Sequence, residues 1–213
     1  MKKRINIPTL IICIISLILY FLTLLFRKIP LNTYINENTH ILRTPFLDKL
    51  MSYISFISAP LLISLIVLII VAYFFYKKDY FKLLFTILTF YVGLLILHID
   101  KAIIANSRPE NALISSFGFS FPSGHVAGAV LISGLLVYFY KDEIKNIYLK
   151  ILTITILTLL PFIIAFNRIY LQVHWLTDII GALFLAIFWF TLILLFQDRI
   201  KHVINKKIKV KIK

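Results

Sequence analysis

The apolar residues of this chain fall into long runs that are separated by short polar segments. A helix needs about 17–25 such residues to cross the hydrocarbon core of a membrane, and six runs approach this length. They are Ile7–Phe26, Ile54–Tyr76, Phe81–Leu97, Ser123–Tyr140, Leu149–Phe166 and Leu176–Phe196. No polar segment is long enough for a separate domain. The pattern therefore predicts an all-α polytopic membrane protein, with six transmembrane helices in a single bundle formed by residues 1–213.

The composition agrees with this prediction. Hydrophobic residues make up 61% of the 213 positions, whereas a soluble domain is about half apolar. The first run is long and lacks a small-residue cleavage site, so we expect it to remain in place as a helix. The single cysteine, Cys13, lies inside that run, which excludes a disulfide framework.

Lysine and arginine are unevenly distributed among the polar segments. The amino terminus, the segments after the second and fourth runs, and the basic tail of residues 197–213 hold 16 of the 23. The other seven are Arg27, Lys28, Arg43, Lys49, Lys101, Arg108 and Arg168. Because cytoplasmic segments carry the excess of positive charge, both termini are predicted to be cytoplasmic. Topology then accounts for the net charge of +14, so no nucleic acid and no obligate protein partner is implied.

The segment between the first two runs has an amphipathic pattern in its later part. Leu42, Phe46, Leu47 and Leu50 recur at helical spacing. This spacing predicts a short helix. Two placements are open: in the membrane interface beside a lateral entrance for a lipid, or packed against the bundle.

Three polar motifs fall at the predicted outer ends of the last four runs. They read KAIIANSRP from Lys101, PSGH from Pro122, and NRIYLQVHWLTD from Asn167. In the third motif His174 and Asp178 are four positions apart, which places them one turn apart on one helix face. We therefore expect Asp178 to hold the imidazole of His174 in one tautomer and to raise its basicity.

These residue types suit the chemistry of a phosphoryl group. Arginine offers a planar fork to phosphate oxygens and lysine a point charge, and backbone N–H groups at the start of a helix, at Ser123, Gly124 and His125, add donors for an anion. One histidine can attack phosphorus while the other protonates the departing oxygen. The sequence contains no cluster with metal-ligand spacing.

The three motifs together resemble the signature of the type-2 phosphatidic-acid phosphatase superfamily: Lys-x6-Arg-Pro, Pro-Ser-Gly-His, and Arg-x5-His-x3-Asp. The resemblance implies that His174 is the nucleophile and forms a phosphohistidine, that Asp178 orients it, and that His125 is the general acid. The phosphate-binding residues that it implies are Lys101, Arg108, Ser123, Gly124 and Arg168. It also implies catalysis without a metal or other cofactor. Family members usually carry serine before the third-motif arginine, where this chain has Asn167. An amide can still donate a hydrogen bond, so we expect the site to be retained.

The expected activity is removal of the terminal phosphate from a lipid phosphate or diphosphate on the outer face of a bacterial plasma membrane. Undecaprenyl diphosphate is the favoured substrate, with phosphatidylglycerophosphate or phosphatidic acid nearly equal to it. A lipid phosphotransferase and a non-enzymatic lipid transporter or binding protein are the alternatives. His98 and Asp100 are expected to be solvated at the interface and not to act directly, and His40 and His202 lie outside every motif.

Overall fold

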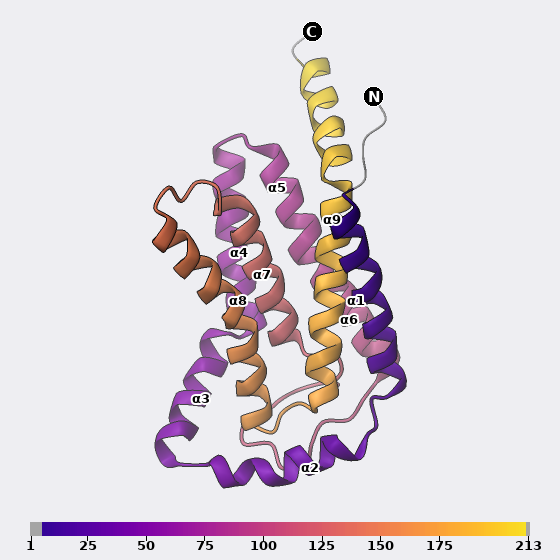
Figure 1. Cartoon of the computed structure of the whole chain (residues 1–213), viewed down its shortest axis with the longest axis vertical. Coiled ribbons are helices and arrows are strands. Elements are labelled where there is room, and N and C mark those ends of the chain that lie inside the picture. The colour runs from indigo at the N-terminus through magenta and orange to yellow at the C-terminus, as the bar shows by residue number, and fades with distance from the viewer. Residues whose placement is uncertain (1–5, 212–213) are drawn as a thin grey trace.

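All regular structure in the described part of the chain is helical, which confirms the predicted all-α class. The structure is a computed structural model that describes the backbone of residues 6–211 and the side chains of residues 6–206. The elements are α1 (Ile7–Leu25), α2 (Pro30–Asn38), η1 (Thr39–Leu42), α3 (Pro45–Ile57), α4 (Pro60–Tyr76), α5 (Tyr80–Thr86), the π-helical segment η2 (Ile87–Tyr91), α6 (Val92–Ile104), α7 (Gly124–Tyr140), α8 (Ile147–Tyr170) and α9 (Leu176–Lys211) (Figure 1). The predictions for the amino-terminal lysines and for the last tail side chains lie outside the described residues.

Four helical segments of the described chain are long and apolar enough to cross a membrane: Ile7–Leu25, Tyr80–Ile104, Ile147–Tyr170 and Leu176–Lys206. A fifth candidate is the pair α3 and α4, which together pass the same test but are bent by 41°. The remaining apolar helix, α7, has 17 residues and is shorter than the others. By length and composition the described chain thus has four or five candidate spans, fewer than the six predicted.

The second predicted run, Ile54–Tyr76, is not one helix. It is broken between α3 and α4, where Ala59 has an extended ψ of 134° and Pro60 begins the next helix. Proline disfavours a helical conformation in the residue before it and has no N–H for the preceding turn, which explains the break. The predicted amphipathic helix is present as α3 and begins at a Thr44 cap, although Leu42 lies before it in η1.

Several helices extend beyond the apolar runs that predicted them. α6 continues past Leu97 to Ile104, where Ala105 adopts a left-handed φ of 49°. α8 continues past Phe166 to Tyr170, and α9 runs through the basic tail to Lys211. Apolar runs end where burial or lipid contact ends, whereas a helix ends where a cap or a backbone turn ends it. Lys101 and Arg168 are therefore helical residues.

The helices form one bundle in which α1 lies along α9 and α7 lies against both α8 and α9 (Figure 1). Buried apolar side chains from several helices fill the interior: Val67, Phe85, Phe90, Leu97, Phe121, Leu131 and Ile164. α1 begins at the same end of the molecule as the carboxyl end of α9, and α2 lies across the opposite end (Figure 1). The loops that precede α7 and α9 also pass through the α2 end, which brings the polar motifs together there.

Candidate active site

The three motifs meet around one cavity of about 690 Å³ at the end of the bundle that α2 crosses. Six of the eight predicted site residues line it: Lys101, Arg108, Gly124, His125, Arg168 and His174. The other two, Ser123 and Asp178, are fully buried and do not line it. Within residues 6–206, no three His, Cys, Asp or Glu side chains are grouped so that they could hold a metal ion.

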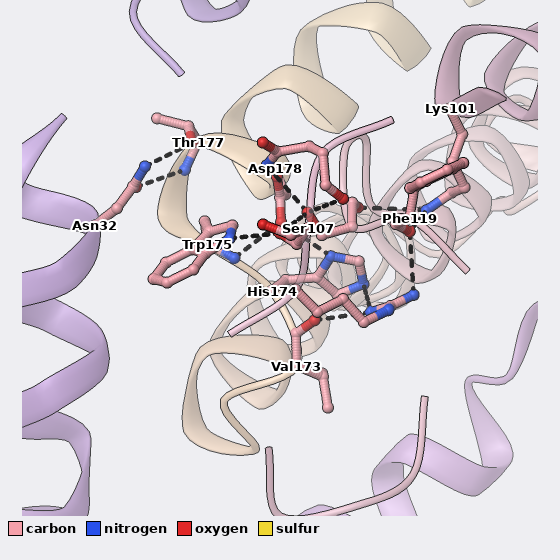
Figure 2. A network of polar contacts seen from close by, with 12 residues as sticks. Asn32, Lys101, Ser107, Phe119, Val173, His174, Trp175, Thr177 and Asp178 are labelled. Carbon is pink, nitrogen blue, oxygen red and sulfur yellow. Dashed lines mark hydrogen bonds and ion pairs between the residues drawn. The ribbon is translucent and has the colours of Figure 1, made fainter. Parts of the chain in front are cut away.

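His174 lies between a carboxylate and a guanidinium (Figure 2). Its Nδ1 is 3.3 Å from Asp178 Oδ2 and its Nε2 is 3.3 Å from Arg108 Nη1. A carboxylate only accepts hydrogen bonds and a guanidinium only donates them, so the neutral imidazole carries its proton on Nδ1. The lone pair on Nε2 is then on the side of Arg108, a residue that lines the cavity.

The predicted pairing of His174 with Asp178 is present, but its geometry differs from the one expected. His174 precedes α9, and only Asp178 lies in the first turn of that helix. Asp178 Oδ2 also accepts the N–H of Trp175 at 2.9 Å. The carboxylate of Asp178 therefore binds two groups of the loop that precedes α9. One is the N–H of Trp175 and the other is the imidazole of His174.

Burial and the neighbouring carboxylate act on His174 in opposite directions. The side chain is 3% exposed, and this burial lowers the pKa of His174 to about 4, although the hydrogen bond to Asp178 raises it. Asp178 thus raises the pKa of His174 as expected, but desolvation lowers it by more. The imidazole is neutral at physiological pH, which is the form that a nucleophile requires.

Arg168 is held by the amide of Asn167. Its Nε donates to Asn167 Oδ1 at 3.0 Å, and its Nη2 donates to the same oxygen. Asn167 Nδ2 in turn donates to Met51 O at 2.6 Å, which ties α8 to α3. The remaining nitrogen, Arg168 Nη1, lies 3.1 Å from His125 Nε2. The amide of Asn167 thus donates a hydrogen bond, as expected, to Met51 O. Its oxygen also accepts from Arg168 and orients the guanidinium.

Lys101 and Arg108 hold the segment of residues 117–120. Lys101 Nζ donates to Phe119 O at 2.7 Å, and Arg108 Nε donates to Gly118 O at 3.0 Å. Gly118 has a left-handed φ of 70°, which glycine adopts without strain. Burial lowers the pKa of Arg108, and the charge of Asp178 opposes this shift. Both cations donate to neutral carbonyl oxygens. An anion in the cavity would compete with these oxygens for the N–H groups of the cations.

Ser123 differs from its predicted role. Its backbone N–H donates to Asp178 O at 3.1 Å and is therefore not available to an anion. Its Oγ is buried and has no hydrogen-bond partner within the described chain, so it does not cap α7. The N–H groups of Gly124 and His125 lie in the first turn of α7, where helix geometry provides no acceptor.

Asn106 is a site residue that the sequence interpretation missed. Its Nδ2 donates to Asp178 Oδ1 at 3.3 Å and to Ser120 Oγ at 3.0 Å. It thus binds the carboxylate oxygen that does not face His174. Its position inside the first motif is the only sequence signal, and it gives no indication of a contact with a residue 72 positions away.

The two polar residues near Lys101 have separate partners. His98 lines the cavity, but its Nδ1 lies 2.7 Å from Leu94 O of the same helix. Asp100 does not line it and instead accepts a hydrogen bond from Tyr20 Oη at 2.5 Å. His40 and His202 are exposed and lie outside the cavity.

Comparison with known proteins identifies relatives of this chain. The PAP2 superfamily model matches residues 100–201. Phosphatidylglycerophosphatase B of Bacillus subtilis (strain 168) is 31% identical over 197 residues, which cover 88% of this chain and 96% of that protein.

Two solved structures share the fold. The transmembrane PAP2 type phosphatidylglycerolphosphate phosphatase from Bacillus subtilis superposes with a TM-score of 0.78 at 25% identity, over 88% of this chain and 96% of that one. Aquifex aeolicus LpxE gives a TM-score of 0.62 at 22% identity, over 79% and 98% of the two chains. This chain therefore belongs to the PAP2 superfamily and is a multi-pass membrane lipid phosphatase, a hydrolase of phosphate esters.

Proposed function

We propose that this enzyme removes the terminal phosphate of phosphatidylglycerophosphate through a phosphohistidine on His174. The observation that carries the mechanism is the placement of His174 between Asp178 and Arg108, on the same cavity as His125 and Arg168. The cavity thus joins a neutral nucleophile, a second imidazole and three cations. The substrate follows from the relatives, which are named for that lipid.

In the first half-reaction His174 Nε2 attacks phosphorus and the bond from phosphorus to the glycerol oxygen breaks. Lys101, Arg108 and Arg168 neutralise the equatorial oxygens, where the charge of the transition state gathers. The N–H groups of Gly124 and His125, two residues that line the cavity, are further donors. Asp178 keeps the proton on Nδ1 and stabilises the charge that develops on the ring.

His125 serves as the general acid for the departing oxygen. In the structure its Nε2 faces Arg168 Nη1, which only donates, so this nitrogen carries no proton in that arrangement. A bound phosphate accepts the hydrogen bond of Arg168 Nη1 in place of His125 Nε2, which then takes up a proton from solvent, and His125 passes this proton to the leaving group. In the second half-reaction His125 accepts a proton from water as the water oxygen attacks phosphorus, and His174 departs with inorganic phosphate as the product.

A lipid substrate fits the surroundings of the cavity. The last turn of α3 contributes Phe56 to its lining, and the 117–120 segment contributes Phe117. Both aromatic side chains are largely exposed, at 70% and 93%, which suits contact with acyl chains. Undecaprenyl diphosphate is the second candidate, because three cations on one cavity also suit a diphosphate.

The proposed topology has six spans, with α3 and α4 acting as a single broken span and α7 as a short one. Both termini are cytoplasmic and the cavity opens on the outer face of a bacterial plasma membrane. The uneven distribution of lysine and arginine supports this orientation.

The test is phosphate release from a panel of lipids in detergent with EDTA present. The panel contains phosphatidylglycerophosphate, phosphatidic acid and undecaprenyl diphosphate. We expect the fastest release from phosphatidylglycerophosphate, no effect of EDTA, and loss of activity in His174→Ala. Full activity of His174→Ala on every lipid would overturn the mechanism, and abolition by EDTA would overturn catalysis without a metal. Transfer of the phosphate to a second lipid, in place of its release, would instead indicate a phosphotransferase.

A further inference from the structure

A second cavity of about 380 Å³ lies beside the catalytic one, between the end of α1, the start of α2 and the loop that follows α6. The residues that line it include Arg27, Lys28, Asn32, Asn106, Ser107 and Trp175. Among these described residues there are two cations and no carboxylate. The proposed catalytic mechanism uses neither cation.

The two cations are free to bind an anion. Arg27 uses Nη1 to donate to Leu24 O at 3.0 Å. No ion pair joins Arg27 or Lys28 to a carboxylate within the described residues. Two adjacent cations repel each other, and a dianion that both can reach relieves this repulsion. A planar guanidinium beside a flexible ammonium is a combination that suits phosphate oxygens.

The backbone beneath these cations is held rigidly. The carbonyl of Arg27 accepts from Asn32 Nδ2 at 2.7 Å and from Thr177 Oγ1 at 3.0 Å. Asn32 and Thr177 are buried and bond to each other, as Figure 2 shows. Arg27 therefore projects from a base that is fixed to the start of α9. Such pre-organisation reduces the entropy lost when a ligand binds.

Trp175 and Ser107 line the second cavity and are bonded to each other. The indole Nε1 donates to Ser107 O at 2.8 Å (Figure 2). Each of these residues is next in sequence to a residue of the catalytic cavity, since Trp175 follows His174 and Ser107 precedes Arg108. A ligand in the second cavity therefore lies against the direct sequence neighbours of His174 and Arg108.

We propose that this cavity is a second phosphate-binding site, which takes the phosphate of a lipid head group or free inorganic phosphate. Arg27 and Lys28 hold the oxygens, and the positive end of the α2 dipole adds to the attraction. The site lies on the same end of the bundle as the catalytic cavity but is a separate compartment. Its occupant contacts Ser107 and Trp175, which line the cavity.

The experiment measures binding of radiolabelled inorganic phosphate to the full chain in detergent by equilibrium dialysis. The test variant is the double substitution Arg27→Gln and Lys28→Gln. The matched control is Lys77→Gln with Lys78→Gln, which removes two adjacent cations from the turn after α4. Thermal unfolding of each variant verifies that it is folded. A second arm repeats the titration with a short-chain phosphatidylglycerol, whose phosphate is a diester.

We expect two phosphates per chain in the wild type and in the control, and one in the Arg27 and Lys28 variant. If only the diester is lost from the variant, the occupant is a lipid head group; if inorganic phosphate is lost, the site also takes the free ion. Equal stoichiometry and affinity for both ligands in wild type and variant would overturn the second site. That result leaves the proposed catalytic function intact, because the latter depends on His174→Ala and not on Arg27 or Lys28.

Discussion

At the scale of single residues, the site depends on buried groups whose partners restrict what they can do. The imidazole of His174 is kept neutral by burial and is oriented by Asp178. The carboxylate of Asp178 is itself held by Trp175 N–H and Asn106 Nδ2. Removal of any of these partners is expected to disturb the orientation of His174, the proposed nucleophile, without removing its imidazole.

The pH dependence of catalysis follows from the lowered pKa of His174. An imidazolium has no lone pair for attack, so kcat/KM, whose pH profile reports the free enzyme, should be retained from neutral pH downwards and be lost as pH falls through about 4. Two substrates whose phosphates differ in pKa distinguish this limb of the pH profile from ionisation of the substrate. A limb that arises from the enzyme has the same pH midpoint with both substrates, whereas a limb that arises from the substrate shifts. An enzyme limb near pH 6.5, the ordinary value for histidine, would contradict the assignment.

The same shift has a consequence for stability. The pKa of His174 in the folded chain lies below its unfolded value of 6.5. Between these values only the unfolded chain binds the proton, so stability declines as pH falls from about 6.5 to about 4 and this contribution then levels off. A His174→Gln variant, compared with the wild type by thermal unfolding, should lack this part of the decline.

Asn167 is predicted to position Arg168. Asn167→Ala removes the acceptor for two guanidinium N–H groups and leaves a charged, buried side chain under-bonded. Lost hydrogen bonds to a charge are worth about 1.5–3 kcal/mol, which corresponds to a fall in kcat/KM of about 10- to 150-fold.

The conservative variant separates positioning from packing. Asn167→Ser keeps a hydroxyl near Arg168 but is too short to contact Met51 O as well, so its activity should lie between those of wild type and Asn167→Ala. The limb of the pH profile assigned to His174 should not move in either variant. Wild-type kinetics for Asn167→Ala would show that Arg168 does not need this support.

At the scale of elements, the break before Pro60 and the helix ends determine which groups reach the cavity. α6 ends late enough to carry Lys101 on its last turn, and the α3–α4 junction supplies Ala59 and Pro60 to the lining. α1 contributes no lining residue of the catalytic cavity, yet it contacts the site through Tyr20. The hydroxyl of Tyr20 binds Asp100, which directly precedes Lys101, and its ring lies 6.2 Å from that of Phe121, close to Ser123.

Tyr20→Phe is therefore expected to loosen the segment that carries Lys101, because the change removes the hydroxyl that binds Asp100 and keeps the ring that packs against Phe121. The change leaves Asp100 without its donor in a partly buried position, a loss of about 1–3 kcal/mol in unfolding free energy. A displaced Lys101 should raise KM more than it lowers kcat. Thermal unfolding and phosphate-release kinetics measure both effects. Tyr34→Phe on α2, an exposed tyrosine, is the control, and equal behaviour of the two variants would contradict the role of Tyr20.

At the scale of the whole molecule, the bundle separates two ends with different chemistry. The polar motifs and α2 lie at one end, and the turns after α4 and α7 lie with the carboxyl end of α9 at the other (Figure 1). The proposed orientation places the first end outside the cell. It requires α7, with 17 residues, to act as a span beside longer neighbours.

Labelling of introduced cysteines tests this orientation. Cys13→Ser removes the single native cysteine, after which Glu37→Cys in α2 and Lys145→Cys after α7 are made separately. Both positions are exposed. A maleimide that does not cross membranes should label Glu37→Cys in intact cells and Lys145→Cys only after the membrane is opened. The reverse pattern would place the catalytic cavity in the cytoplasm.

The sequence by itself determined the helical class, the approximate positions of the apolar helices and six of the residues that line one cavity. These features are local, because they depend on hydrophobic length and on motif spacing. The sequence did not determine that the second apolar run is broken and bent before Pro60, although it contains that proline. It also did not determine how far α6, α8 and α9 continue.

Only the tertiary structure decided how the site residues are paired. The contacts of Asn106 with Asp178, of Asn167 with Met51 and of Tyr20 with Asp100 join residues 72, 116 and 80 positions apart. The hydrogen bond from Ser123 N–H to Asp178 O is another contact between residues far apart in the sequence. Such contacts depend on how helix ends and loops pack against one another, and no local pattern in the chain encodes that packing. For the same physical reason, the dominance of burial over the carboxylate at His174 became evident only in the folded molecule.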